Sequence, residues 1–139
     1  MPADLDQSGN SYQRVRAYLG PSLGWVEVQV QPEVKITSGG TFTVQFGNYV
    51  ILVDVNAPVT IQLPDVRVWV SQNFYQPASG FERAIWIKDL GGNASLQNIT
   101  VTPFSTQTID KLAQSFTILQ SRQLLRLYPL NDMTGWFSG

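Results

Sequence analysis

From residue 25 onward, apolar and polar residues alternate with a period of two, which is the pattern of half-buried β-strands. Valine, for example, occupies every second position of the first such stretch after its tryptophan. Between the stretches stand turn sequences rich in Gly, Asn, Pro and Asp. The predicted strands cover residues 25–31, 41–46, 49–55, 59–63, 66–70, 84–89, 98–102, 116–120, 122–128 and 134–137.

Many short strands joined by turns are typical of all-β sandwiches, jelly rolls and barrels. We therefore expect residues 25–139 to form an antiparallel sandwich or jelly-roll-like domain. Residues 108–114 are the one place where a helical turn is considered, and they fit a hairpin loop equally well.

The first 24 residues differ from the rest and are interpreted as a short N-terminal arm or docking segment. The spacing of apolar residues in positions 12–19 would place them on one side of a two-turn helix, although so short a helix needs a surface to dock on. A frayed terminus is the alternative. The polar, acidic start does not have the form of a signal peptide. The candidate docking residues are Tyr12, Arg14, Val15, Arg16, Tyr18 and Leu19.

The composition excludes several kinds of chemistry. The chain of 139 residues has no His and no Cys, so a Ser-His-Asp triad, a Cys-His dyad and a His- or Cys-ligated zinc site are impossible. Nine basic against ten acidic residues provide no basic patch for nucleic acid. No apolar run approaches the ~18 residues of a membrane helix. We expect no metal, no cofactor, no nucleic acid and no membrane insertion.

The remaining enzyme chemistry would need a pair of carboxylates, as in glycoside hydrolases. No two of the candidates form a local motif, and most have a simple structural explanation in turns or at strand ends. We therefore expect a protein that is not an enzyme. The candidates are Asp54, Asp65, Glu82, Asp89 and Asp110.

Large apolar residues stand where solvent-facing residues would be expected. Trp69 and Trp86 occupy the outward phase of their predicted strands, and Phe74 and Tyr75 lie in the long connection 71–80. With only 14% charged residues in the chain, such aromatics indicate contact with a partner or receptor. The stretch 49–55 is apolar on both faces, which fits either a central strand or a subunit interface.

The C-terminal two thirds also resemble a β-rich module of tailed-phage virion proteins. In that module a strand ending in Leu-Pro is followed by a strand ending in Lys-Asp, a glycine turn, an Ile-Thr-Val strand, an Ile-Asp turn and a final pair ending in Trp. The matching segments are residues 59–64, 85–94, 98–103, 108–110, 116–118, 125–128 and 135–136. Members include tail-fibre tips, tail-needle knobs and head fibres or spikes, including those of phage-like particles.

The resemblance implies a compact antiparallel β domain, usually trimeric, with a structural or adhesive role and no catalytic residue to transfer. Here residues 66–80 are inserted between the Leu-Pro and Lys-Asp strands. The expected function is a virion decoration, spike or connector, assembled in the host cytoplasm, that docks on other capsid or tail proteins by its arm. Two alternatives stay open: a receptor-binding tip that recognises a cell-surface glycan, and a free carbohydrate-binding β-sandwich.

Overall fold

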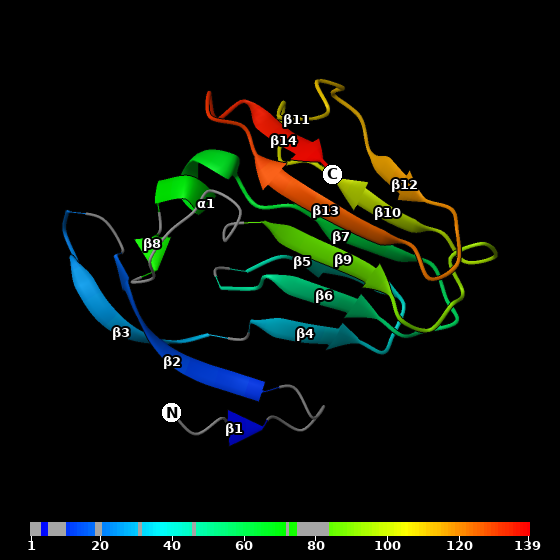
Figure 1. Cartoon of the computed structure of the whole chain (residues 1–139), viewed down its shortest axis with the longest axis horizontal. Coiled ribbons are helices and arrows are strands. Elements are labelled where there is room, and N and C mark those ends of the chain that lie inside the picture. Colours follow the sequence, from blue (N-terminus) through cyan, green and yellow to red (C-terminus); the bar gives the residue numbers. More distant parts are fainter. Residues whose placement is uncertain are drawn as a thin grey trace.

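The fold was analysed in a computed structural model. It describes residues 4–5, 11–18, 21–30, 32–45, 47–71, 73–74 and 84–139, with the backbone alone described for 4–5, 11–18, 25–30 and 73–74. Within these ranges the chain is predominantly β, with two facing sheets and one short helix (Figure 1). The all-β prediction is therefore confirmed.

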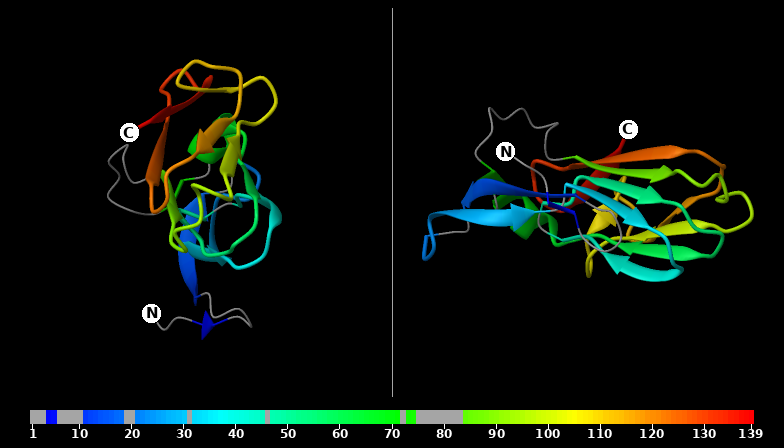
Figure 2. Two further views of the ribbon diagram at one scale, coloured as in Figure 1. Left: turned by 90° about the vertical axis from the view of Figure 1, so that its right-hand side faces the viewer. Right: turned by 90° about the horizontal axis from the view of Figure 1, so that it is seen from below.

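Six strands form the front sheet, in the order β11-β14-β13-β9-β6-β4. Four strands form the back sheet, in the order β12-β10-β7-β5. The two sheets lie face to face (Figure 2). The front strands are β4 (Glu33–Ile36), β6 (Val50–Val53), β9 (Ile85–Asp89), β11 (Thr108–Ile109), β13 (Leu124–Pro129) and β14 (Gly135–Ser138). The back strands are β5 (Gly40–Thr43), β7 (Val59–Gln62), β10 (Ile99–Thr102) and β12 (Phe116–Ile118).

The chain passes three times from the front sheet to the back sheet, through β4 and β5, then β6 and β7, then β9 and β10. Each pass places its strands parallel to those of the previous pass. The expectation of an antiparallel domain is therefore wrong for β4, β6 and β9 of the front sheet and for β5, β7 and β10 of the back sheet. Alternation determines which face of a strand is buried, but it contains no information about the direction of the neighbouring strand.

Antiparallel pairing appears after the third pass. β12 lies antiparallel to β10, β13 to β9, and β14 to β13, while β11 pairs parallel with β14. The segment 108–114, considered as a helical turn or a hairpin loop, begins with the short strand β11. The chain then turns at Asp110 and Lys111, which both have positive φ.

The core lies between the sheets because the strands keep their apolar residues in register. Equivalent inward positions on neighbouring front strands are filled by Val34, Ile51, Ile87 and Leu125. Ile61 and Val101 are paired in the same way on the back sheet, and both are fully buried. Branched side chains that stack from one strand to the next across each sheet give a continuous apolar interior. The stretch 49–55 contributes β6, which lies between β9 and β4, so its interpretation as a strand within the sheet is confirmed. Its interpretation as a subunit interface stays a prediction.

A further sheet is formed by β1 (Asp4–Leu5), β2 (Ser11–Tyr18) and β3 (Trp25–Val30), with β8 (Asn73–Phe74) also paired to β2. The helix considered for residues 12–19 is therefore wrong for the described part, because residues 11–18 form a strand. Antiparallel pairing with β3 supplies backbone hydrogen bonds that a two-turn helix in isolation would not retain. The proposed arm and the first predicted strand thus share one hairpin.

The prediction of a strand at residues 66–70 is also wrong, because Val66–Ser71 forms the helix α1. Asp65 caps it: its side-chain Oδ1 accepts the Arg67 backbone N–H at 3.0 Å, and its carbonyl accepts the Trp69 N–H at 2.9 Å. Val66 and Trp69, three residues apart, share the buried face. The cap and this packing outweigh the strand preference of the three valines.

Candidate functional site

The outer sides of the two sheets differ in character. On the back sheet, matching outward positions of four neighbouring strands hold Thr41, Thr60, Thr100 and Thr117. On the front sheet, several outward positions are apolar, and we call this set the outer apolar face. It comprises Val50, Leu52, Trp86, Leu124, Tyr128 and Phe137.

Trp86 is the largest side chain of the outer apolar face and is 40% exposed, which confirms its predicted outward orientation. It is paired in register with Val50 on one side and Arg126 on the other. The Arg126 guanidinium carbon lies 5.6 Å from the centroid of the Trp86 ring, within the range of a cation–π contact. The indole is thus supported from one side while part of its surface stays in contact with solvent.

Tyr128 and Phe137 extend the same face toward the C-terminus. They are paired in register, and their rings stack with centroids 5.1 Å apart at an interplanar angle of 27°. Leu124 and Phe137 are both exposed. An array of large apolar groups on one side of a sheet is typical of a surface that is covered in an assembly.

Trp69 does not lie on this surface. It is 5% exposed and packs edge-on between Tyr49, at a ring-centroid distance of 5.7 Å, and Trp136, at 6.0 Å. The expectation that Trp69 contacts a partner is therefore wrong within this chain. The physical reason is the helix α1, which turns Trp69 inward, whereas its neighbour Val68 is exposed.

The remaining predicted contact residues are described in part or not at all. Phe74 belongs to β8, and its backbone pairs with Ala17 of β2. Its side chain and the whole of Tyr75 lie outside the described residues. The same applies to Leu19 and to the side chains of the other candidate docking residues, Tyr12, Arg14, Val15, Arg16 and Tyr18, whose backbone is that of β2.

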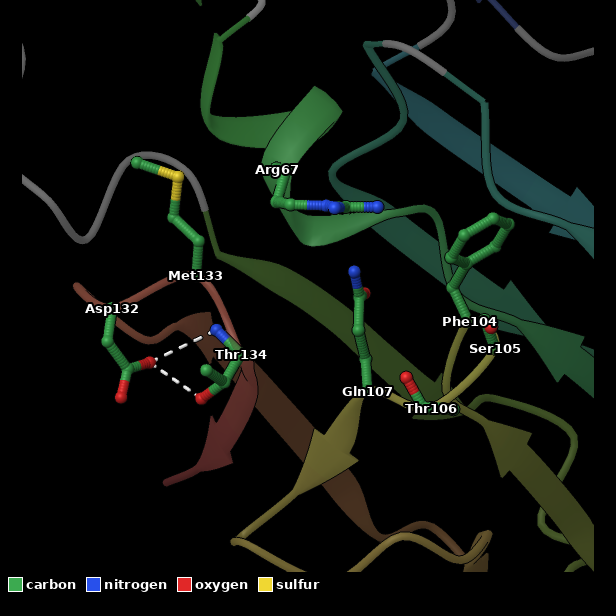
Figure 3. A pocket seen from close by; sticks show the side chains of 8 residues that line it. All are labelled: Arg67, Phe104, Ser105, Thr106, Gln107, Asp132, Met133 and Thr134. Atoms are coloured by element: carbon green, nitrogen blue, oxygen red, sulfur yellow. Dashed lines mark hydrogen bonds between the residues drawn. The ribbon is translucent and has the colours of Figure 1, made fainter.

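An open pocket of about 530 Å³ lies at one end of the sandwich, between α1 and the loops that follow β10 and β13 (Figure 3). In the view of Figure 3, Arg67 and Gln107 occupy its middle, with Phe104 on one side and Asp132 and Met133 on the other. Its lining consists of Arg67, Phe104, Ser105, Thr106, Gln107, Asp132, Met133 and Thr134.

Asp65 organises the floor of this pocket. Its carboxylate accepts hydrogen bonds from Nε and Nη2 of Arg67, at 3.2 and 3.0 Å, and from Nε2 of Gln107 at 2.7 Å. Gln107 in turn accepts the backbone N–H of Val66 at 3.0 Å. The hydrogen bond from Arg67 is the main cause that lowers the pKa of Asp65 to about 2, with Gln107 adding to it. At neutral pH Asp65 is therefore ionised, and its charge holds Arg67 and Gln107 in place.

The other described candidate carboxylates also have local partners. Asp54 lies 3.7 Å from Nζ of Lys35, and Asp110 accepts the backbone N–H of Ser138 at 2.8 Å. Asp89 is buried and accepts hydrogen bonds from four backbone N–H groups. Glu82 lies outside the described residues. Among the described side chains, no three acidic groups gather where they could hold a metal ion.

Sequence reasoning missed the pocket because its residues come from three separate segments in ordinary turn settings. The Pro-Asp pair before α1 was a possible signal, since Asp is a preferred residue at helix starts.

In the described part of the chain, no helix is long and apolar enough to span a bilayer. No protein-family model matches the chain, and no curated protein is significantly similar to it in sequence.

Proposed function

We propose that this chain is a non-enzymatic structural protein of a tailed-phage virion or phage-like particle, such as a head decoration, spike or connector. In this proposal its β domain assembles with further copies, most simply as a homotrimer, and its N-terminal residues 1–24 dock on another capsid or tail protein. The virion setting rests on the resemblance of residues 50–137 to phage modules.

The outer apolar face is the observation that carries the assembly role. The outer side of the back sheet is lined with threonine, which is an ordinary solvent-facing strand residue, whereas the outer side of the front sheet exposes Trp86, Leu124 and Phe137. Burial of apolar area contributes about 25 cal/mol per Å². Covering this face in an oligomer therefore provides a driving force that the back sheet cannot supply.

The proposal predicts that the full-length protein is an oligomer, which sedimentation equilibrium at micromolar concentration will measure. Trp86→Asp should raise the dissociation constant by about a hundredfold or more, because aromatic residues at the centre of an interface dominate binding and a buried unpaired charge is costly. Circular dichroism should show that the substituted chain keeps its β structure.

Leu96→Asp is the matched control. Leu96 is an exposed leucine in the turn between β9 and β10 and is not part of the outer apolar face, so a change of the same character should leave the oligomer intact. A wild-type protein that sediments as a monomer would contradict the assembly role, as would a Trp86→Asp protein that assembles like the wild type.

A further inference from the structure

The pocket between α1 and the loops after β10 and β13 is independent of the outer apolar face and has the features of a ligand site. Its volume of about 530 Å³ falls within the range of roughly 300–1,000 Å³ that is common for small-molecule sites. Most of its lining residues belong to loops that the sandwich holds in place, and binding residues are often found on such loops.

The floor of the pocket is held in place before any ligand arrives. Gln107 is buried and bonded at both ends of its amide, to Asp65 and to the Val66 backbone. Arg67 is held by two hydrogen bonds to the same carboxylate, yet its side chain is largely exposed. Such prior ordering lowers the entropy that binding would cost.

The charges of the lining argue against an anionic ligand. The guanidinium of Arg67 is already paired with Asp65, and the opposite wall carries the carboxylate of Asp132. Oδ1 of Asp132 accepts two hydrogen bonds from Thr134, through its backbone N–H at 3.1 Å and its hydroxyl at 2.7 Å (Figure 3). A phosphate or carboxylate would meet an Arg67 that is already compensated by Asp65, and the nearby positive charge of Lys111 is directed at Asp132, whose pKa it helps to lower. A neutral hydroxyl group, in contrast, can both donate and accept.

Phe104 adds an apolar surface to these polar groups. Phe104 is 40% exposed and adjoins the hydroxyl-bearing residues Ser105 and Thr106. A ring face next to hydrogen-bonding groups suits a ligand with one apolar C–H face and a rim of hydroxyls. A pyranose has this character.

Both loops also hold a non-glycine residue in the left-handed region, Ser105 with φ 50° and Met133 with φ 60°. Such conformations are less stable than the ordinary ones and are frequent at binding sites. Here they shape the two walls of one pocket.

We propose that this pocket binds a neutral saccharide, with one sugar ring against Phe104 and other hydroxyls of the saccharide bonded to the free N–H groups of Arg67 and, on the far side of the pocket, to Asp132. Because its residues lie outside the outer apolar face, the site does not depend on the assembly role. The full-length protein should bind at least one member of a panel of neutral hexose and N-acetylhexosamine oligosaccharides at millimolar or lower concentration, measured by calorimetry. Uronic-acid and sialylated counterparts should bind more weakly.

Two substitutions test the named contacts. Phe104→Ala should weaken binding of the best neutral oligosaccharide by about tenfold or more, and Asp132→Asn, which keeps the shape of the side chain, by about fivefold. Phe137→Ala is the control, because Phe137 has the same exposed fraction of 40% but lies on the outer apolar face. It should leave saccharide affinity unchanged, whatever it does to assembly, and circular dichroism verifies that each protein is folded.

Three results would overturn the proposal: no panel member binds at millimolar concentration, acidic sugars bind better than neutral ones, or Phe104→Ala and Asp132→Asn bind as the wild type does. None of these results bears on sedimentation, so a failure here is distinguishable from a failure of the assembly role.

Discussion

Replacing Asp89 with Ala should lower the free energy of unfolding by about 3 kcal/mol or more, because it leaves several backbone donors without an acceptor. Asp89 is 2% exposed, at the end of β9. Its Oδ1 accepts the N–H groups of Gly92 and Asn93, at 3.1 and 3.3 Å, and its Oδ2 those of Ala94 and Arg122, at 3.0 and 2.9 Å. One carboxylate thereby joins the turn after β9 to the turn before β13. Denaturant unfolding followed by tryptophan fluorescence will measure the loss.

Asp54→Ala is the control for this prediction. Asp54 is an exposed carboxylate whose ion pair with Lys35 spans 3.7 Å, and such pairs contribute under about 1 kcal/mol. If the two substitutions destabilise the protein equally, the bonds of Asp89 do not have the weight that we assign to them.

The same site predicts a dependence on pH. Burial raises the pKa of Asp89, but the four backbone N–H groups together outweigh it and hold the pKa below the ordinary value of 3.8. A carboxyl whose folded-state pKa is lowered stabilises the fold above its unfolded-state pKa, and this contribution disappears as pH falls through the folded-state value. The difference in stability between the wild type and Asp89→Asn should therefore be constant near neutral pH and shrink below about pH 4. A difference that grows on acidification would contradict this assignment.

Gly135→Ala should be the second severe substitution, lowering the free energy of unfolding by about 3 kcal/mol or more. Gly135 begins β14 and is paired with Thr108 of β11. An added Cβ would lie 2.2 Å from the Thr108 carbonyl oxygen and 2.8 Å from its backbone nitrogen. Because these are backbone atoms, relief requires the two strands to separate. Thermal unfolding will measure the effect.

Gly139→Ala adds the same methyl group at the end of the chain and is the control. Its Cβ would lie 2.9 Å from Cε2 of Tyr128, a ring that can move aside. We expect a loss under about 1 kcal/mol, as for surface changes in general. A Gly135→Ala protein as stable as Gly139→Ala would show that β11 is not held closely against β14.

The outward position of Trp86 could be predicted from the sequence, and the pocket could not. Trp86 alternates with Ile85 and Ile87, so its outward orientation follows from the period of a strand. Trp69 stands in the same kind of pattern, but Asp65 begins a helix there, and a helix places residues three apart on one face. A short apolar run fits both periods, and the Asp65 cap together with packing against Tyr49 and Trp136 distinguishes them.

The sequence by itself determined the class of the fold, the positions of most strands and, where the alternation is regular, the side of the strand that faces the core. These properties depend on local alternation and turn residues, which the chain specifies within a few positions. The tertiary structure decided the parallel arrangement of the three passes, the inward position of Trp69 and the gathering of Arg67, Phe104 and Asp132 around one pocket. Those features depend on which distant segments become neighbours, and period-two alternation is the same whichever neighbour a strand acquires.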